Sequence, residues 1–148
     1  MAGSLTNYGE AAALTALFLS GNTWLGLLSG NPAETGDAST EVSGNAYTRK
    51  QITWSALTGA APSTLTNTTQ LLFPSSTGAW RSGAALAYFG IFDAASGGNM
   101  LAYGDLSPAQ TVSASAQTVL VDVGQLSVTC DLRTGSSERS SACLQQEM

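Results

Sequence analysis

Short apolar runs alternate with clusters of turn-forming residues along most of the chain, and this pattern limits the fold more than any other feature. Runs rich in β-branched and aromatic residues lie at 23–28, 86–93 and 118–123, and Gly, Ser, Asn and Pro gather between them. Such short runs, bounded by turn residues, are typical of strands. Their near-regular spacing predicts a mainly β fold, a single β-sandwich or jelly-roll-like domain over residues 1–130.

A hairpin is the clearest local prediction. The runs 86–93 and 100–103 enclose a turn that contains Gly97, Gly98 and Asn99. Glycine and asparagine accept the positive φ that tight hairpin loops need, so the two runs should pair. Further strands are expected at 47–54, 64–68 and 126–129, and a long exposed loop is expected at 30–45.

One N-terminal helix is predicted, at about residues 7–19. Asn7 and Glu10 have the spacing of a capping box, with Asn7 as the N-cap residue. The residues that follow contain no helix breaker before Ser20-Gly21-Asn22. The helical spacing of Leu14, Leu17 and Phe18 predicts an apolar stripe that packs on the β domain or on a neighbouring copy.

The C-terminal segment 131–148 differs from the rest of the chain. It is rich in Ser, Gln and Glu and has few large apolar residues, so we expect a polar tail or an arm that orders on a neighbour. The two cysteines, Cys130 and Cys143, are too far apart for a CxxC motif. A disulfide between them is conceivable, but synthesis in a cytoplasm favours free thiols.

Charged residues make up 10% of the chain, against about 25% in an average soluble domain. Two interpretations stay open: much of the surface is buried against neighbouring proteins, or the chain is a monomer coated with hydroxyl groups. With a net charge of −5 and one adjacent basic pair, Arg49-Lys50, direct nucleic-acid binding is not expected. No apolar run approaches the roughly 20 residues of a membrane span, and no basic N-terminal signal is evident.

Catalysis and cofactor binding are not expected. The chain contains no histidine, which excludes a Ser-His-Asp triad, and it has no phosphate-binding glycine motif. Glu34, Asp37 and Glu41 are the one candidate group for calcium, but their spacing does not match an EF-hand loop. The tryptophans are expected in the core rather than on a sugar-binding platform. The carboxylates considered for acid–base chemistry are Glu10, Glu34, Asp37, Glu41, Asp93, Asp105 and Asp122.

Several segments resemble a family of small structural proteins from tailed phages. They are 4–10, 24–28, 41–49, 88–104 and 126–129, and the similarity covers about residues 4–130. Proteins of this kind carry the labels tail fibre protein or capsid decoration (cement) protein. The resemblance implies a non-enzymatic virion component that is made in the cytoplasm of a host bacterium.

Within that family, the absence of a repeat or stalk in the sequence favours a compact cement module over an elongated fibre. The expected partners are the major capsid protein at the capsid surface and other copies of the chain in a homotrimer. The alternatives are a tail fibre or baseplate subunit bound to tail proteins, and a carbohydrate-binding receptor module. The candidate partner contacts are Glu34, Asp37, Glu41, Arg49 and Lys50.

Overall fold

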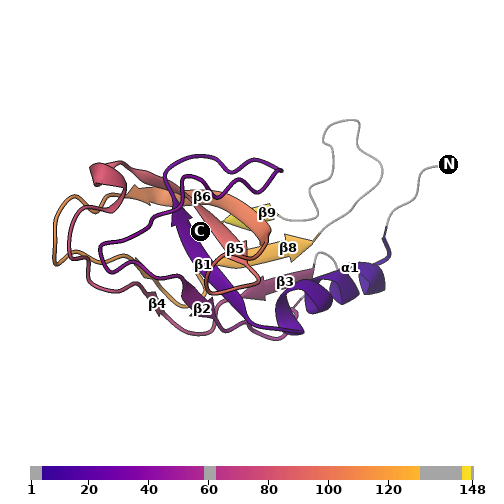
Figure 1. Cartoon of the computed structure of the whole chain (residues 1–148). Helices are drawn as coiled ribbons and strands as arrows, with labels where there is room; N and C mark the ends of the chain where they lie inside the picture. Colours follow the sequence, from indigo (N-terminus) through magenta and orange to yellow (C-terminus); the bar gives the residue numbers. More distant parts are fainter. Residues whose placement is uncertain (1–4, 59–62, 131–144, 148) are drawn as a thin grey trace.

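The computed structural model describes residues 5–58, 63–130 and 145–147 and is mainly β, with one short α-helix near the N-terminus (Figure 1). This confirms the predicted fold class. The strands are β1 (Thr23–Leu28), β2 (Lys50–Ile52), β3 (Ser63–Thr66), β4 (Leu71–Leu72), β5 (Leu86–Phe92), β6 (Met100–Gln110), β7 (Leu120–Val121), β8 (Ser127–Cys130) and β9 (Gln145–Glu147). The helical elements are α1 (Asn7–Leu14), the π-helical η1 (Thr15–Leu19) and the 3-10 turn η2 (Trp80–Gly83).

The described strands form three antiparallel sheets. The largest has the order β2-β1-β5-β6, the second has the order β3-β8-β9, and β4 pairs with β7. The central strand β1 pairs with β2 through Thr23–Leu25 and with β5 along Trp24–Leu28. All residues of β1 except Trp24 are also buried, so both faces of the strand are covered, which explains why its sequence is almost continuously apolar rather than alternating.

The core lies between these sheets and takes side chains from nearly every strand. Leu27 of β1, Phe89 of β5, Leu65 of β3 and Val128 of β8 are all inaccessible to solvent. Trp80 is also fully buried, as the sequence predicted for the tryptophans. Trp54 and Trp24 are half-buried, and the Trp54 indole N–H donates to the Thr23 hydroxyl at 2.8 Å.

The predicted hairpin is present as β5 and β6, which pair from Phe92↔Met100 toward Leu86↔Gln110. Gly97 and Gly98 take positive φ values of 62° and 70°, as the turn requires. β6 continues past the predicted end at residue 103. The loop 30–45 is less exposed than expected, because Val42 is buried and its N–H donates to the Leu27 carbonyl at 3.0 Å.

The helix differs from the prediction at both ends. The N-cap residue is Thr6 instead of Asn7, and its hydroxyl accepts the Gly9 N–H at 3.2 Å. Either side chain can cap a helix, so the sequence left the start uncertain by one residue. The α-helix also passes into a π-helical turn after Leu14.

Leu14 and Phe18 are buried against the β domain, whereas Leu17 is 44% exposed. Leu14 and Phe18 lie four residues apart and so occupy one side, whereas Leu17 is offset from Phe18 by about 100° around the helix. Leu14 and Phe18 thus pack on the β domain, and the packing of Leu17 on a neighbouring copy stays a prediction. Figure 1 shows α1 at one end of the molecule, next to β3 and β8.

The predicted polar tail 131–148 falls mainly on residues outside the described ranges, so a separate tail stays a prediction. Within it, Gln145–Glu147 form β9, which pairs with β8. Cys130 is fully buried and disulfide-bonded, which corrects the expectation of a free thiol there. The free thiol was predicted from the reducing conditions of the cytoplasm. That argument does not consider where the fold places the sulfur atom. Within the described ranges, no helix has the length and apolarity needed to cross a bilayer.

Phe18 should be the main anchor of the N-terminal helical segment. Its ring is buried and meets the Trp54 ring edge-on at a centroid distance of 5.7 Å. Phe18→Ala should lower the free energy of unfolding by roughly 3–5 kcal/mol, measured by urea denaturation. The matched change Leu17→Ala removes an exposed side chain and should cost less than about 1 kcal/mol. Equal losses in the two variants would contradict the placement of Phe18 in the core.

Candidate functional site

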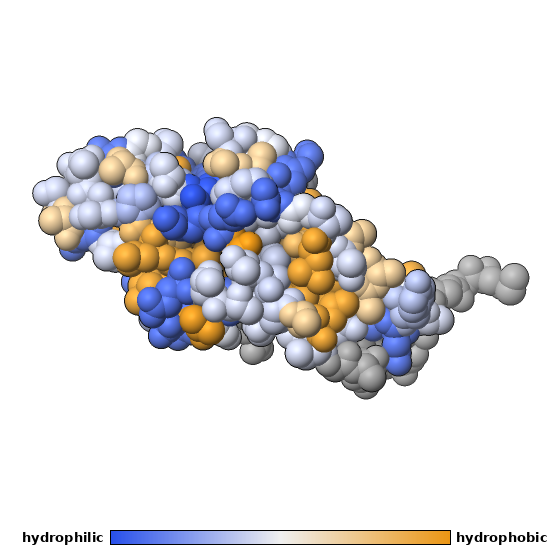
Figure 2. All heavy atoms as spheres, turned by 90° about the horizontal axis from the view of Figure 1, so that it is seen from below, coloured by the Kyte–Doolittle hydropathy of each residue, from blue (hydrophilic) through white to orange (hydrophobic). Residues whose placement is uncertain are grey.

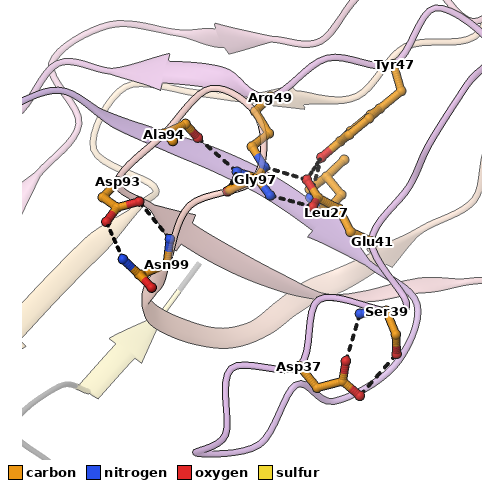
Figure 3. Close-up of polar contacts among 10 residues, drawn as sticks. All are labelled: Leu27, Asp37, Ser39, Glu41, Tyr47, Arg49, Asp93, Ala94, Gly97 and Asn99. Atoms are coloured by element: carbon orange, nitrogen blue, oxygen red, sulfur yellow. Dashed lines mark hydrogen bonds and ion pairs between the residues drawn. The ribbon is translucent and has the colours of Figure 1, made fainter.

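A largely buried ion pair between Arg49 and Glu41 is the main polar feature of the fold (Figure 3). The Arg49 Nε and Nη2 atoms donate to the two carboxylate oxygens of Glu41, each at 2.7 Å. The exposed fractions of the two side chains are 6% for Arg49 and 14% for Glu41. Such a two-pronged, charge-assisted contact fixes both side chains in one geometry.

The same guanidinium also holds the tip of the β5–β6 hairpin. Its Nη1 atom donates to the backbone carbonyls of Ala94 at 2.8 Å and Gly97 at 2.7 Å. Its carbon centre lies 3.4 Å from the centroid of the Phe92 ring, which is a cation–π distance. Arg49 therefore connects the segment before β2, the loop at Glu41 and the hairpin tip.

Tyr47 extends this network into the central sheet. β2 pairs with β1 only as far as Leu25, so the Leu27 N–H on that edge needs another acceptor. The Tyr47 hydroxyl oxygen accepts it at 2.9 Å, and the hydroxyl donates to Glu41 at 3.1 Å. Burial, followed by the negative charge of Glu41, raises the pKa of Tyr47 far above its usual value, so this hydroxyl keeps its proton.

Gly26 is required for the close approach of these groups. A β-carbon at this position would lie 2.8 Å from a Glu41 carboxylate oxygen and 2.8 Å from the Phe92 ring. Any side chain would therefore displace the ion pair from the surface of β1. Sequence reasoning did not identify Gly26 or Tyr47, because neither residue carries a charge and their partners are distant in the sequence.

An open depression of about 330 Å³ lies beside the ion pair. It is lined by the 41–49 segment and by residues 95–97 of the hairpin tip. Arg49 already uses Nε, Nη1 and Nη2 in internal bonds, so it is not available as a free cation for an anionic ligand. Within the described ranges, no group of acidic residues, cysteine or histidine is arranged to hold a metal ion.

Two other carboxylates stabilise turns. The Asn99 side-chain amide and backbone N–H donate to Asp93 at 2.9 and 2.7 Å, and these bonds lower the Asp93 pKa. The Ser39 backbone N–H and hydroxyl act on Asp37 in the same way and lower its pKa. Figure 3 shows both carboxylates bonded within their own turns, apart from the Arg49 network.

The structure thus places the five predicted contact residues in different settings. Glu41 and Arg49 bind each other and support the fold, while Glu34 and Asp37 are exposed on their loop. Lys50 is half-buried at the start of β2. A role for these residues in contacting other proteins stays a prediction.

Comparison with known families gives the class of protein. Residues 4–129 match the family described as podophage GP4 fiber I protein gp80. The chain belongs to this family. A search of curated proteins found no match. The matched residues include the helix, the Arg49 network and β1 to β8 up to residue 129. The match confirms the resemblance to tailed-phage structural proteins that the sequence indicated.

The hydrogen bonds and ion pair of Arg49 should contribute measurably to the stability of the fold. Arg49→Lys keeps the charge but loses the planar fork, so it cannot make all of these bonds. We expect a loss of roughly 1.5–3 kcal/mol in the free energy of unfolding, measured by chemical denaturation. The matched change Arg81→Lys affects an exposed arginine and should cost less than about 0.5 kcal/mol. If both variants are as stable as the wild type, Arg49 does not hold these segments together.

The stability that Asp93 contributes should depend on pH. The pKa of Asp93 is lower in the folded protein, so the bonds from Asn99 stabilise the fold above the usual carboxyl pKa and are lost as pH falls through the lowered value. Asp93→Asn should lower the melting temperature near about pH 7, and the difference should vanish toward about pH 2. Asn99→Ala should show the same convergence. A difference that persists unchanged at acid pH would contradict this assignment.

Proposed function

We propose that the chain is a non-enzymatic structural module of the tail fibre apparatus of a podophage virion. The observation that carries the proposal is the family match over residues 4–129. That family is described as a fibre protein, so it favours the tail alternative over the capsid decoration role that the sequence analysis preferred. On this proposal the partners are neighbouring tail proteins and other copies of the chain.

The geometry of the polar residues supports a structural role. Glu41 is paired with Arg49, Asp93 accepts bonds from Asn99, and Asp122 accepts a bond from Gln70 at 3.0 Å. Carboxylates that support turns and loops in this way are not placed as an acid–base pair around a substrate. The sequence also contains no histidine, the residue most often used for proton transfer near neutral pH.

The network of hydrogen bonds around Arg49 also suits a structural module. It fixes a long loop and a hairpin tip to the central sheet, and these segments would otherwise have little secondary structure to hold them. A surface whose shape is fixed before assembly loses less conformational entropy when it binds. The carbohydrate-binding alternative receives no support from the tryptophans, which are buried or half-buried.

The location in the particle tests this proposal. Virions that encode the protein should be disrupted and separated into heads and tails, and the chain should be quantified in each fraction by mass spectrometry. We expect it to follow a tail marker protein and to be depleted from heads. Recovery on heads at equal stoichiometry with the major capsid protein would overturn the fibre proposal and support capsid decoration.

A further inference from the structure

The β4–β7 ribbon and the turn after it expose large apolar side chains. Leu72 and Leu120 are cross-strand partners on this ribbon, with exposed fractions of 52% and 48%. Val123, which follows β7, is 55% exposed. Figure 2 shows an apolar area toward β4, with hydrophilic residues beside it. We call Leu72, Leu120 and Val123 the ribbon patch, and an exposed apolar group of this kind is typical of a site of contact with another molecule.

A small groove adjoins the ribbon patch and shares Leu120 with it. The groove has a volume of about 80 Å³, and its other lining residues are Leu106, Ser107, Pro108, Gln110, Val119 and Gln125. Sites for small-molecule ligands usually enclose roughly 300–1,000 Å³, so this groove is too small for one. It has the size of a pocket for a single side chain, and a large side chain that fills such a pocket is a common anchor of protein–protein contacts.

Asp122 supplies a negative charge at this patch. It is exposed and directly precedes Val123 in the sequence. A hydrogen bond from the Gln70 side chain and a second from the Val123 N–H lower the pKa of Asp122, so its carboxylate is ionised at neutral pH. Both bonds end on the Oδ1 atom. Among the described residues the Oδ2 atom has no donor, so it can accept a bond from a partner.

The segments that form this side of the molecule carry acids but no bases. Residues 63–79 and 100–128 include β3, β4, β6 and β7, and they contain Asp105 and Asp122 but neither Lys nor Arg. Asp105 is exposed and directly precedes Leu106, which lines the groove. An apolar patch with negative charge beside it is complementary to a surface that presents an apolar side chain next to Lys or Arg.

The negative charge also argues against other occupants of the ribbon patch. Nucleic acids and membranes that contain anionic lipids are themselves negative, and proteins bind them through basic surfaces. In a symmetric contact between two copies of the chain, the two Asp122 carboxylates would come together at the axis, and like charges oppose such a contact. The occupant that fits is therefore a different protein with positive charge.

We propose that the ribbon patch is a docking surface for a different protein of the virion, one that presents a large apolar side chain flanked by Lys or Arg. The apolar side chain enters the groove beside Leu120, and the neighbouring cation pairs with Asp122. Leu72 and Val123 cover the rest of the contact and exclude water from it. The inference rests on the proposed structural role in a virion, but it does not depend on whether the chain is located on tails or heads.

Photocrosslinking in intact virions tests the proposal. Virions are produced with the photoreactive residue p-benzoylphenylalanine in place of Leu120 and irradiated, and the cross-linked peptides are identified by mass spectrometry. We expect an adduct with a different virion protein, at a peptide with Lys or Arg within a few residues of the attachment point. The same residue in place of Ser96, which is exposed at the hairpin tip, is the control and should not give this adduct.

The outcomes separate this inference from the proposed location on tails. Adducts only with another copy of the chain, with a peptide that lacks Lys and Arg, or with no protein would overturn the docking proposal. An adduct with a basic segment of the major capsid protein would support the docking surface and overturn the tail location. A chain that is recovered on tails without an adduct at Leu120 would do the reverse.

Two substitutions of Leu120 with opposite charge test the sign of the partner. Leu120→Lys and Leu120→Glu both remove the apolar side chain, but the lysine alone adds a charge that repels a basic partner. In cells that supply variant and wild-type chains equally, incorporation of Leu120→Lys into virions should fall more than about tenfold, and that of Leu120→Glu should fall less. Ser96→Lys adds the same charge at the hairpin tip and should be incorporated like the wild type.

Stability and the order of the variants supply the remaining controls. Leu120 is exposed, so the melting temperatures of the purified Leu120 variants should stay close to that of the wild type. Incorporation of both variants at the wild-type level would overturn the proposal. So would a larger loss for Leu120→Glu than for Leu120→Lys, because the partner would then be acidic or neutral.

Discussion

The Arg49–Glu41 ion pair is the interaction on which the irregular half of this structure depends. The regular strands hold one another through backbone ladders, but the 30–49 segment and the β5–β6 tip have few such bonds. The Arg49 guanidinium supplies hydrogen bonds to these segments, because it donates to the Glu41 carboxylate and to the backbone carbonyls of Ala94 and Gly97. The pair excludes most water, so its hydrogen bonds act in a medium of lower dielectric than a surface ion pair would have. The loop and the tip are consequently part of the folded body.

The local patterns of the sequence were sufficient to predict the main strands and the hairpin. Short apolar runs identified β1, β5 and β8, and the Gly97-Gly98 pair marked the turn before β6, because these features act through neighbouring residues. The end of the helix and the exposure of Leu17 depend on how the helix meets the sheet. That orientation is a tertiary property and has no signature in helical spacing alone.

The sequence identified two charged residues of the polar site, but it did not predict that they bind each other. Glu41 and Arg49 were chosen as outward contacts because they are charged, yet they face each other. Their pairing depends on Gly26, which leaves room on β1, and on Tyr47, whose hydroxyl donates to Glu41. Each of these residues is unremarkable in the sequence. What makes them important is their proximity, which arises from the antiparallel packing of distant segments.

The direct connection between the helical segment and the central strand has a mechanical consequence. The helical segment ends at Leu19, and β1 starts at Thr23 and is flanked by β2 and β5. A pull applied through the helix would reach β1 along its own axis. The hydrogen bonds to β2 and β5 lie across that direction, so the load would act on both ladders in shear rather than opening them one bond at a time. A chain tethered by its N-terminal end would thus resist tension with a strand that is paired along both edges.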